Sequence, residues 1–158
     1  MSKAVYIFAT SGGHFGELRQ WVEDIESEVV IYVDGPEAHV LGNDIIHIRK
    51  INSVFDAIAA CCRIIAGNTI QFPKAFFSAG AQNALTAYLL SLFYRVPYFY
   101  VESFQRTENL SRSGVFSVLV AKKVFLFHDI DFSYLPWWIR AIVKIRKNIV
   151  LNERILEG

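Results

Sequence analysis

The chain has 158 residues, which fits one globular domain of about 100–200 residues. Hydrophobic residues make up 53% of it and charged residues 20%, which excludes intrinsic disorder because enough apolar surface is present to offset chain entropy. The net charge is +1, so no overall field favours nucleic acid. The charge is uneven, however: residues 136–158 hold five of the 16 Lys and Arg residues but two of the 15 Asp and Glu residues.

Apolar runs alternate with helical patterns along the chain. Short continuous apolar runs are typical of strands buried on both faces, and apolar residues spaced three or four apart are typical of helices. In chain order we predict a strand at 4–9, a helix at 14–22, strands at 28–33 and 44–48, a helix at 53–66, a strand at 74–77, a helix at 82–94, a strand at 97–101, a helix at 114–121 and a strand at 123–127. This alternation predicts an α/β, doubly wound, Rossmann-like domain over residues 1–130, with a parallel sheet and helices on both faces.

Residues 131–158 differ in kind and are predicted to form a separate C-terminal segment. There Trp137 and Trp138 are followed by Arg140 and Lys144, a mixture of aromatic and basic residues that suits an amphipathic segment on anionic lipid. The alternative is a helix that packs on the sheet or on a partner with its charges in solvent.

The cysteines, the N-terminus and the apolar stretches indicate in which cellular compartment the protein is expected. Cys61 and Cys62 are adjacent, so we expect no disulfide between them, and the sequence offers no spacing for a metal site. Met1-Ser2-Lys3 leads directly into a strand-like run, which argues against a signal peptide. The apolar stretch 84–94 is shorter than the roughly 20 residues that cross a bilayer. We therefore expect a soluble cytoplasmic domain, able to lie on a membrane, without metal or cofactor.

The first candidate site follows the first predicted strand. Ser11, Gly12, Gly13 and His14 lie between this strand and a helix, at the carboxyl end of the sheet where open α/β folds bind ligands. Two glycines let backbone N–H groups point outward, and the helix N-terminus adds a positive dipole, so the loop suits a phosphate or diphosphate. The same dipole favours a neutral His14 ring that can accept a proton. The alternative is a plain glycine-rich turn.

Two more polar groups follow later strands at the same edge. Ser78 and Gly80 offer a hydroxyl and a close backbone approach, or simply a turn. Glu102 ends an apolar strand, where a carboxylate can bind sugar hydroxyls or assist proton transfer, or cap a helix in solvent. Ser103 follows it, and Arg106 in the next polar loop can hold an anion.

A different function is also compatible with the first loop. Residues 11–16 come close to the dinucleotide fingerprint G-x-G-x-x-G, with Ser11 in place of the first glycine. Asp34 ends the second strand, where an acidic residue meets a ribose hydroxyl. The alternative prediction is therefore a non-catalytic dinucleotide-binding module.

Three motifs together resemble one family. Ala9-Thr10-Ser11-Gly12-Gly13-His14, Ser78-Ala79-Gly80 and Val101-Glu102-Ser103-Phe104-Gln105-Arg106 are similar, in order and position, to motifs of the oligosaccharide-biosynthesis family that includes bacterial PssD and the eukaryotic asparagine-linked glycosylation protein fourteen. The resemblance covers about residues 4–127. It implies the N-terminal half of a MurG-like GT-B glycosyltransferase, which binds a polyprenyl-diphosphate-linked sugar acceptor while a separate subunit binds the nucleotide sugar.

The resemblance also implies roles for single residues. The 11–14 loop would hold the acceptor diphosphate together with Ser78, Gly80 and Ser103, and His14 or Glu102 would be the base. Arg106 would lie on the rim of the acceptor cleft. The partner would be the donor-binding subunit. The protein would act in capsule or exopolysaccharide synthesis, at the inner face of the cell membrane. Eukaryotic members carry an N-terminal membrane anchor that this sequence does not show, so a bacterial-type protein is expected. Trp137, Trp138, Arg140 and Lys144 would then contact membrane or partner.

Overall fold

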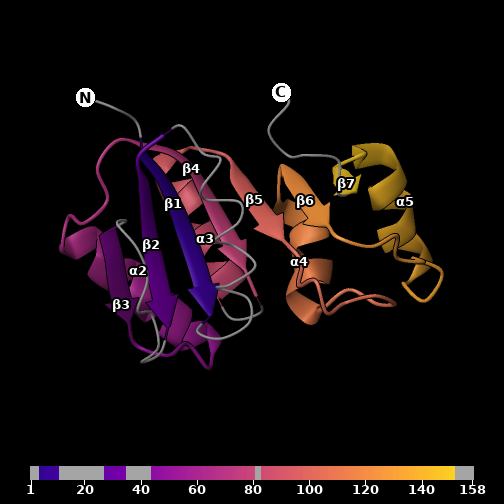
Figure 1. Cartoon of the computed structure of the whole chain (residues 1–158), viewed down its shortest axis with the longest axis horizontal. Helices are drawn as coiled ribbons and strands as arrows, with labels where there is room; N and C mark the ends of the chain where they lie inside the picture. Colours follow the sequence, from indigo (N-terminus) through magenta and orange to yellow (C-terminus); the bar gives the residue numbers. More distant parts are fainter. Residues whose placement is uncertain (1–3, 11–26, 35–43, 81–82, 152–158) are drawn as a thin grey trace.

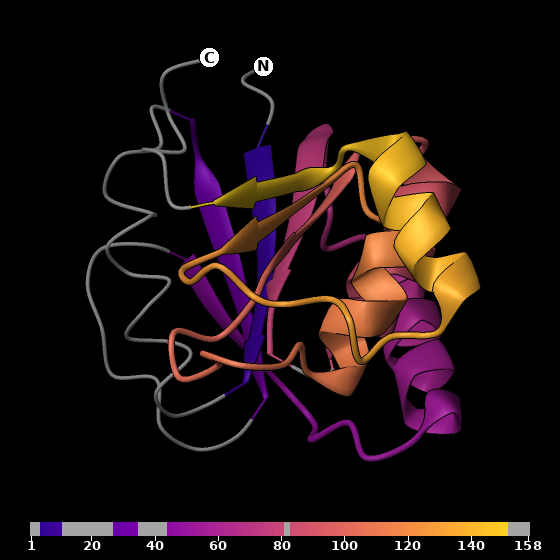
Figure 2. The same ribbon diagram turned by 90° about the vertical axis from the view of Figure 1, so that its right-hand side faces the viewer.

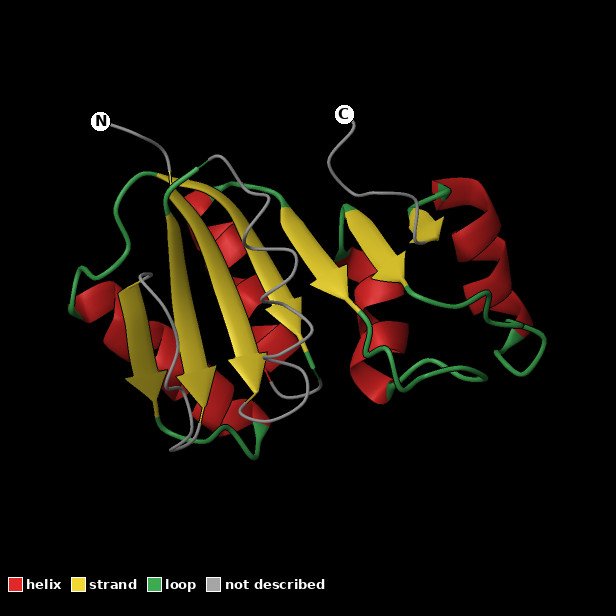
Figure 3. Ribbon diagram, viewed as in Figure 1, coloured by secondary structure: helices red, strands yellow, loops and turns green. Residues whose placement is uncertain are grey.

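The computed structural model describes residues 4–10, 27–34, 44–80 and 83–151. Its elements are strands β1 (Ala4–Thr10), β2 (Val29–Asp34), β3 (Asp44–Ile48), β4 (Pro73–Ala79), β5 (Tyr98–Val101), β6 (Lys123–Leu126) and β7 (Ile149–Leu151), and helices α2 (Val54–Ala66), α3 (Asn83–Tyr94), α4 (Arg112–Val120) and α5 (Trp137–Arg146) (Figures 1 and 3). The predicted strands and the later helices are found within a few residues of their expected bounds. The helix expected at 14–22 lies outside the described residues.

The strands form one parallel sheet in the order β3-β2-β1-β4-β5-β6-β7. The four described helices lie on the same face of this sheet (Figure 2). Strand order reverses between β1 and β4, so the carboxyl ends of these two strands mark the switch point where open α/β sheets bind ligands. The Rossmann-like α/β fold predicted from the sequence is confirmed. The expectation of helices on both faces stays a prediction, because the described helices cover one face and the helix expected at 14–22 lies outside the described residues.

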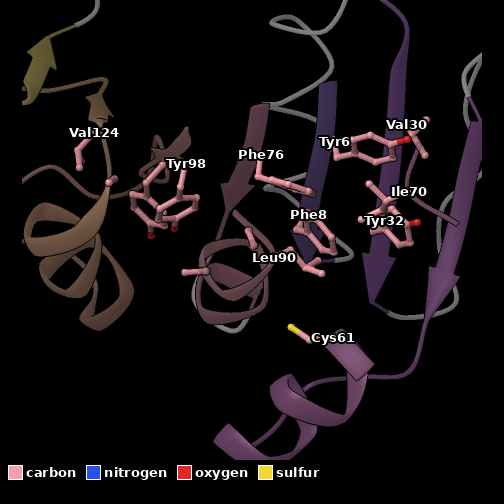
Figure 4. Packing of buried hydrophobic residues seen from close by; sticks show 14 of the residues in the cluster. Tyr6, Phe8, Val30, Tyr32, Cys61, Ile70, Phe76, Leu90, Tyr98 and Val124 are labelled. Carbon is pink, nitrogen blue, oxygen red and sulfur yellow. The ribbon is translucent and has the colours of Figure 1, made fainter. Parts of the chain in front are cut away.

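Burial on both faces explains why β1 and β2 are apolar up to their final residues. The side chains of β1 alternate between a core under the helices and a core on the opposite face, and those of β2 do the same. On the helix side, the Phe8 and Tyr32 rings stack with centroids 4.8 Å apart, and Phe76 packs beside Phe8 (Figure 4). Aromatic residues thus fill the space between sheet and helices, which accounts for part of their high share in the sequence.

The C-terminal part of the chain continues this sheet. β7 pairs with β6 in parallel, and α5 connects them. Arg146 donates from its guanidinium to the carbonyl oxygens of Leu119 and of Ala121, the latter at 2.9 Å. Asn148 Nδ2 donates to Val118 O at 3.0 Å and to Ala121 O at 3.1 Å. These donors satisfy carbonyls at the end of α4 that have no partner within the helix. Residues 137–151, which the sequence analysis places in a separate segment, therefore belong to the sheet and its helical layer.

Candidate functional site at the carboxyl edge of the sheet

The carboxyl edge of the sheet gathers the residues that the sequence singled out. Gly80 directly follows β4 with a φ of 87°, a left-handed conformation that glycine adopts without steric cost. Asp34 ends β2 and is buried. Glu102 follows β5. Ser11, Gly12, Gly13 and His14 lie outside the described residues, so their placement stays a prediction.

Glu102 is a buried carboxylate, with only 2% of its surface exposed. Oε1 accepts from the backbone N–H of Ser103 at 3.0 Å and from the Tyr100 hydroxyl at 3.3 Å. Oε2 accepts from the backbone N–H and the hydroxyl of Ser111, at 2.8 and 2.9 Å. Four donors therefore surround the carboxylate and compensate its removal from water.

These contacts fix the start of α4. Ser111 is the N-cap residue, and its Oγ accepts from the backbone N–H of Gly114 at 3.0 Å while donating to Glu102. A negative charge at a helix N-terminus is further stabilised by the helix dipole. Gly114 leaves room for the carboxylate, because a Cβ there would lie 2.1 Å from Glu102 Oε2. Glu102 thus caps a helix, as one alternative foresaw, but from inside the protein and not from solvent.

Tyr100 completes this cluster. Its hydroxyl is 2.9 Å from Ser113 Oγ and 3.0 Å from Ser111 Oγ. Burial raises the pKa of Tyr100 above its ordinary value, and the nearby Glu102 carboxylate raises it further. The phenol therefore stays protonated and can donate. Ser111, Ser113 and Gly114 were not predicted as site residues; the only signal was the Ser-rich stretch after the polar loop.

The loop after Glu102 forms an exposed rim. Ser103 is buried, and its carbonyl accepts from the backbone N–H of Arg106 at 3.0 Å, which closes a turn. The Arg106 side chain is exposed, and its role in holding an anion stays a prediction. His128 Nε2 donates to Phe104 O at 2.8 Å and joins the end of β6 to the same loop.

Ser78 lies inside the protein. Its side chain is completely buried, and its Oγ shares a 2.8 Å hydrogen bond with the Tyr98 hydroxyl, which also contacts Ser117 Oγ at 3.0 Å. Desolvation raises the pKa of Tyr98, so this hydroxyl also remains protonated. A ligand contact at Ser78 would require this three-hydroxyl cluster to open.

The aromatic and basic residues of α5 lie at the surface. Trp137 is 75% exposed and Trp138 45%, while Ile139, the next residue, is buried. Arg140 and Lys144 are exposed on the same helix. No helix in the described part of the chain is long and apolar enough to cross a membrane.

The chemistry available at this edge is binding chemistry. It offers the exposed side chain of Arg106, which suits an anion, while N–H groups at the start of α4 already donate to Glu102 and Ser111. Among the described residues, no group of three or more His, Cys, Asp or Glu side chains could hold a metal ion.

The comparisons with known proteins agree with the fold. MurG from Acinetobacter baumannii superposes with a TM-score of 0.53 and 16% sequence identity, over 85% of this chain and 43% of that chain. UDP-GlcNAc 2-epimerase from Methanocaldococcus jannaschii gives a TM-score of 0.57 and 12% identity, over 94% of this chain and 45% of that one. No protein-family model matches the sequence, and no curated protein has a significantly similar sequence. The chain therefore has the Rossmann-like α/β fold of part of each of these two structures, and it spans less than half of their length.

Proposed function

We propose that the chain is the acceptor-binding subunit of a two-component, inverting, membrane-associated glycosyltransferase. It would bind a polyprenyl-diphosphate-linked sugar and recruit a donor-binding subunit in capsule or exopolysaccharide synthesis. The observation that supports this most directly is the likeness to MurG over 85% of this chain but 43% of that chain. A second nucleotide-binding unit would then have to come from outside residues 1–158.

The charge and backbone of the carboxyl edge suit the acceptor. The acceptor diphosphate would lie at the switch point, between the glycine loop 11–14 and Gly80, with N–H groups of the helix starts directed at it. Arg106 would meet the outer phosphate from the rim. In the reaction a base removes the proton of the acceptor hydroxyl as this hydroxyl attacks the anomeric carbon of the donor, and the nucleotide diphosphate leaves. Holding the diphosphate aligns the hydroxyl for this attack.

The membrane contact would lie on α5. Tryptophan side chains favour the interface between water and lipid, and basic residues next to them are attracted to anionic headgroups. Trp137, Trp138, Arg140 and Lys144 combine both properties on an exposed helix that starts beyond the carboxyl end of β6. A membrane on this side would keep a lipid-linked acceptor near the carboxyl edge.

Calorimetry with a short-chain prenyl-diphosphate-linked sugar and with sugar nucleotides tests the acceptor role. We expect the prenyl-diphosphate sugar to bind and the sugar nucleotides to bind far more weakly. Arg106→Ala should weaken the affinity for the prenyl-diphosphate sugar by about tenfold or more. The control is Lys123→Ala, which removes an exposed cation at the other end of the sheet. Tight binding of a sugar nucleotide by this chain alone, without acceptor binding, would overturn the proposal.

Flotation with anionic vesicles tests the membrane role. The double variant Trp137→Ala/Trp138→Ala should lose most of the floating fraction, because it removes the two interfacial side chains. Phe93→Ala is the matched control, since Phe93 is a large apolar residue that is 59% exposed at the end of α3. Equal flotation of both variants and the parent chain would contradict a membrane contact through Trp137 and Trp138.

A further inference from the structure

Phe104 is a large apolar side chain that the fold holds at the surface of the carboxyl edge. It lies in the loop after β5, and 53% of its surface is exposed. β5 pairs with β6, and Phe127 and His128 follow directly after β6 (Figure 3). Single exposed apolar residues are common on protein surfaces, so exposure alone says little. The contacts that hold this ring in place set it apart.

Two rings from the end of β6 support Phe104. The Phe127 ring meets it edge to face, with the ring centroids 5.5 Å apart and the planes at 72°. The His128 ring lies against it with the centroids 4.8 Å apart and the planes at 56°. His128 Nε2 also donates to Phe104 O at 2.8 Å, so the two residues are joined through ring and backbone. Contacts between rings have preferred geometries, and these two therefore fix the orientation of the Phe104 ring.

The backbone on either side of Phe104 is also held by hydrogen bonds. The N–H of Ser103 donates to Glu102 Oε1 at 3.0 Å. Ser103 Oγ accepts from the N–H of Gln105 at 3.3 Å, and Ser103 O accepts from the N–H of Arg106 at 3.0 Å. The loop is thus braced without any ligand. A ring held in this way loses little conformational freedom when a ligand stacks on it, which lowers the cost of binding.

The groups around Phe104 select the kind of ligand. The face of an aromatic ring carries a partial negative charge, which attracts the weakly positive C–H groups on one face of a sugar ring. Because Nε2 of His128 donates to Phe104 O, Nδ1 of the neutral imidazole can accept from a sugar hydroxyl. The exposed Arg106 follows in the same loop and can pair with a phosphate. A sugar joined to phosphate uses all three groups.

Other parts of a lipid-linked sugar suit this surface less well. A phosphate would use Arg106 but gain nothing from an aromatic face. A prenyl chain would stack on Phe104 but leave the imidazole of His128 without a polar partner, which costs free energy. Glu102 cannot take the sugar hydroxyls instead, because four donors inside the protein already surround its carboxylate.

We propose that Phe104 stacks against the sugar ring of the lipid-linked acceptor and that His128 accepts a hydrogen bond from one of its hydroxyl groups. This rests on the proposed function and adds the residues that contact the sugar itself. Arg106 would meet the diphosphate from the same loop, so that one braced segment holds both parts of the acceptor. The relative position of sugar and diphosphate then decides how the attacking hydroxyl is aligned.

Calorimetry on the full chain with two matched ligands tests the stacking. One ligand is geranyl diphosphate linked to glucose or galactose. The other is the methyl ester of geranyl diphosphate, which has the same lipid and the same phosphate charge but no sugar. Phe104→Leu should weaken binding of the sugar-linked ligand by about fivefold or more and leave the affinity for the methyl ester unchanged. Phe104→Trp, which keeps an aromatic face, should retain the affinity for the sugar-linked ligand.

Two more variants complete the set. His128→Phe keeps a ring beside Phe104 but has no acceptor for a hydroxyl, so it should weaken binding of the sugar-linked ligand only. Phe93→Leu is the control, because Phe93 is 59% exposed at the end of α3, and it should change neither affinity. Thermal unfolding followed by circular dichroism should give Phe104→Leu a midpoint close to that of the parent chain, since the ring it truncates is half exposed.

The outcomes separate this inference from the acceptor role. Equal losses for both ligands with Phe104→Leu would show that the ring supports the loop or the diphosphate, and would overturn the inference. Unchanged affinities for both would overturn it too, and would leave Phe104 to a protein partner. In these two cases the parent chain still binds the sugar-linked ligand, so the acceptor role stands. If the parent chain binds neither ligand, the acceptor role and this inference fail together.

Discussion

Gly114→Ala tests whether Glu102 holds the start of α4. An alanine inside a helix is normally about 1 kcal/mol more favourable than a glycine. Here the opposite is expected, because the new Cβ would lie 2.1 Å from Glu102 Oε2 and 3.3 Å from the Cβ of Leu110. The carboxylate would have to move by more than 1 Å, about the difference from an ordinary carbon–oxygen contact.

The magnitude follows from the bonds that Oε2 makes. Moving it breaks the hydrogen bonds from the backbone N–H and the hydroxyl of Ser111, at 2.8 and 2.9 Å. Each bond to a charged group contributes about 1.5–3 kcal/mol to stability. Together they amount to about 3–6 kcal/mol, and the helix preference of alanine offsets about 1 kcal/mol. We therefore expect Gly114→Ala to lower the free energy of unfolding by about 2–5 kcal/mol.

A double-mutant cycle separates this cause from a general defect of the helix. Urea unfolding followed by far-ultraviolet circular dichroism gives the free energy of unfolding for the parent chain, Gly114→Ala, Glu102→Ala and the double variant. In the Glu102→Ala background no carboxylate opposes the methyl group, so Gly114→Ala should be neutral or stabilising by up to about 1 kcal/mol. The sign of its effect should therefore change between the two backgrounds. Equal destabilisation in both would refute the contact with Glu102 as the cause.

Three further predictions concern other contacts in the fold. Burial raises the pKa of the Cys61 thiol to about 12, so at pH 8 Ellman's reagent should label only Cys62 in the native chain and both thiols in denaturant. Because the folded pKa is the higher one, the free energy of unfolding should fall as the pH rises from about 9 towards 12. Arg146→Ala should lower the free energy of unfolding in urea by about 1–3 kcal/mol, and Arg146→Lys should recover only part of this because an ammonium lacks the planar fork that reaches two carbonyls. Ser78→Ala and Tyr98→Phe should each cost about 1 kcal/mol and together less than the sum of the two, whereas additive effects would exclude their shared hydrogen bond.

The sequence predicts the sheet well because local and tertiary signals agree there. β1 and β2 are buried on both faces, so their residues are apolar up to the last one, and such continuous apolar runs predict buried strands. β7 was missed because its local sequence pattern and its tertiary contacts point to different structures. It has three residues, Ile149–Leu151, and follows a helix with exposed aromatic and basic side chains, so the local pattern favours an amphipathic segment. Pairing with β6 and capping of α4 by Arg146 place it in the sheet, and both are long-range contacts.

The candidate site was predicted in part. Glu102 stands out because a carboxylate ends an apolar strand, and Gly80 because a glycine follows one. Ser111, which donates twice to Glu102, and Gly114, which leaves room for it, lie about ten residues further along the chain in the stretch Ser-Arg-Ser-Gly, which has no distinctive motif.

The hydrogen bonds that Glu102 already accepts help to decide which group is the general base in the proposed reaction. A carboxylate has about four positions at which it accepts hydrogen bonds, and the backbone and hydroxyl groups around Glu102 supply four donors. A general base needs a free lone pair within reach of the substrate hydroxyl. With all four positions in use inside the protein, Glu102 acts on the site by fixing the start of α4 and the loop that presents Arg106. In the proposed reaction the proton acceptor is then His14 or a group of the donor-binding partner. A His14→Ala variant with full activity in the assembled complex would assign it to the partner.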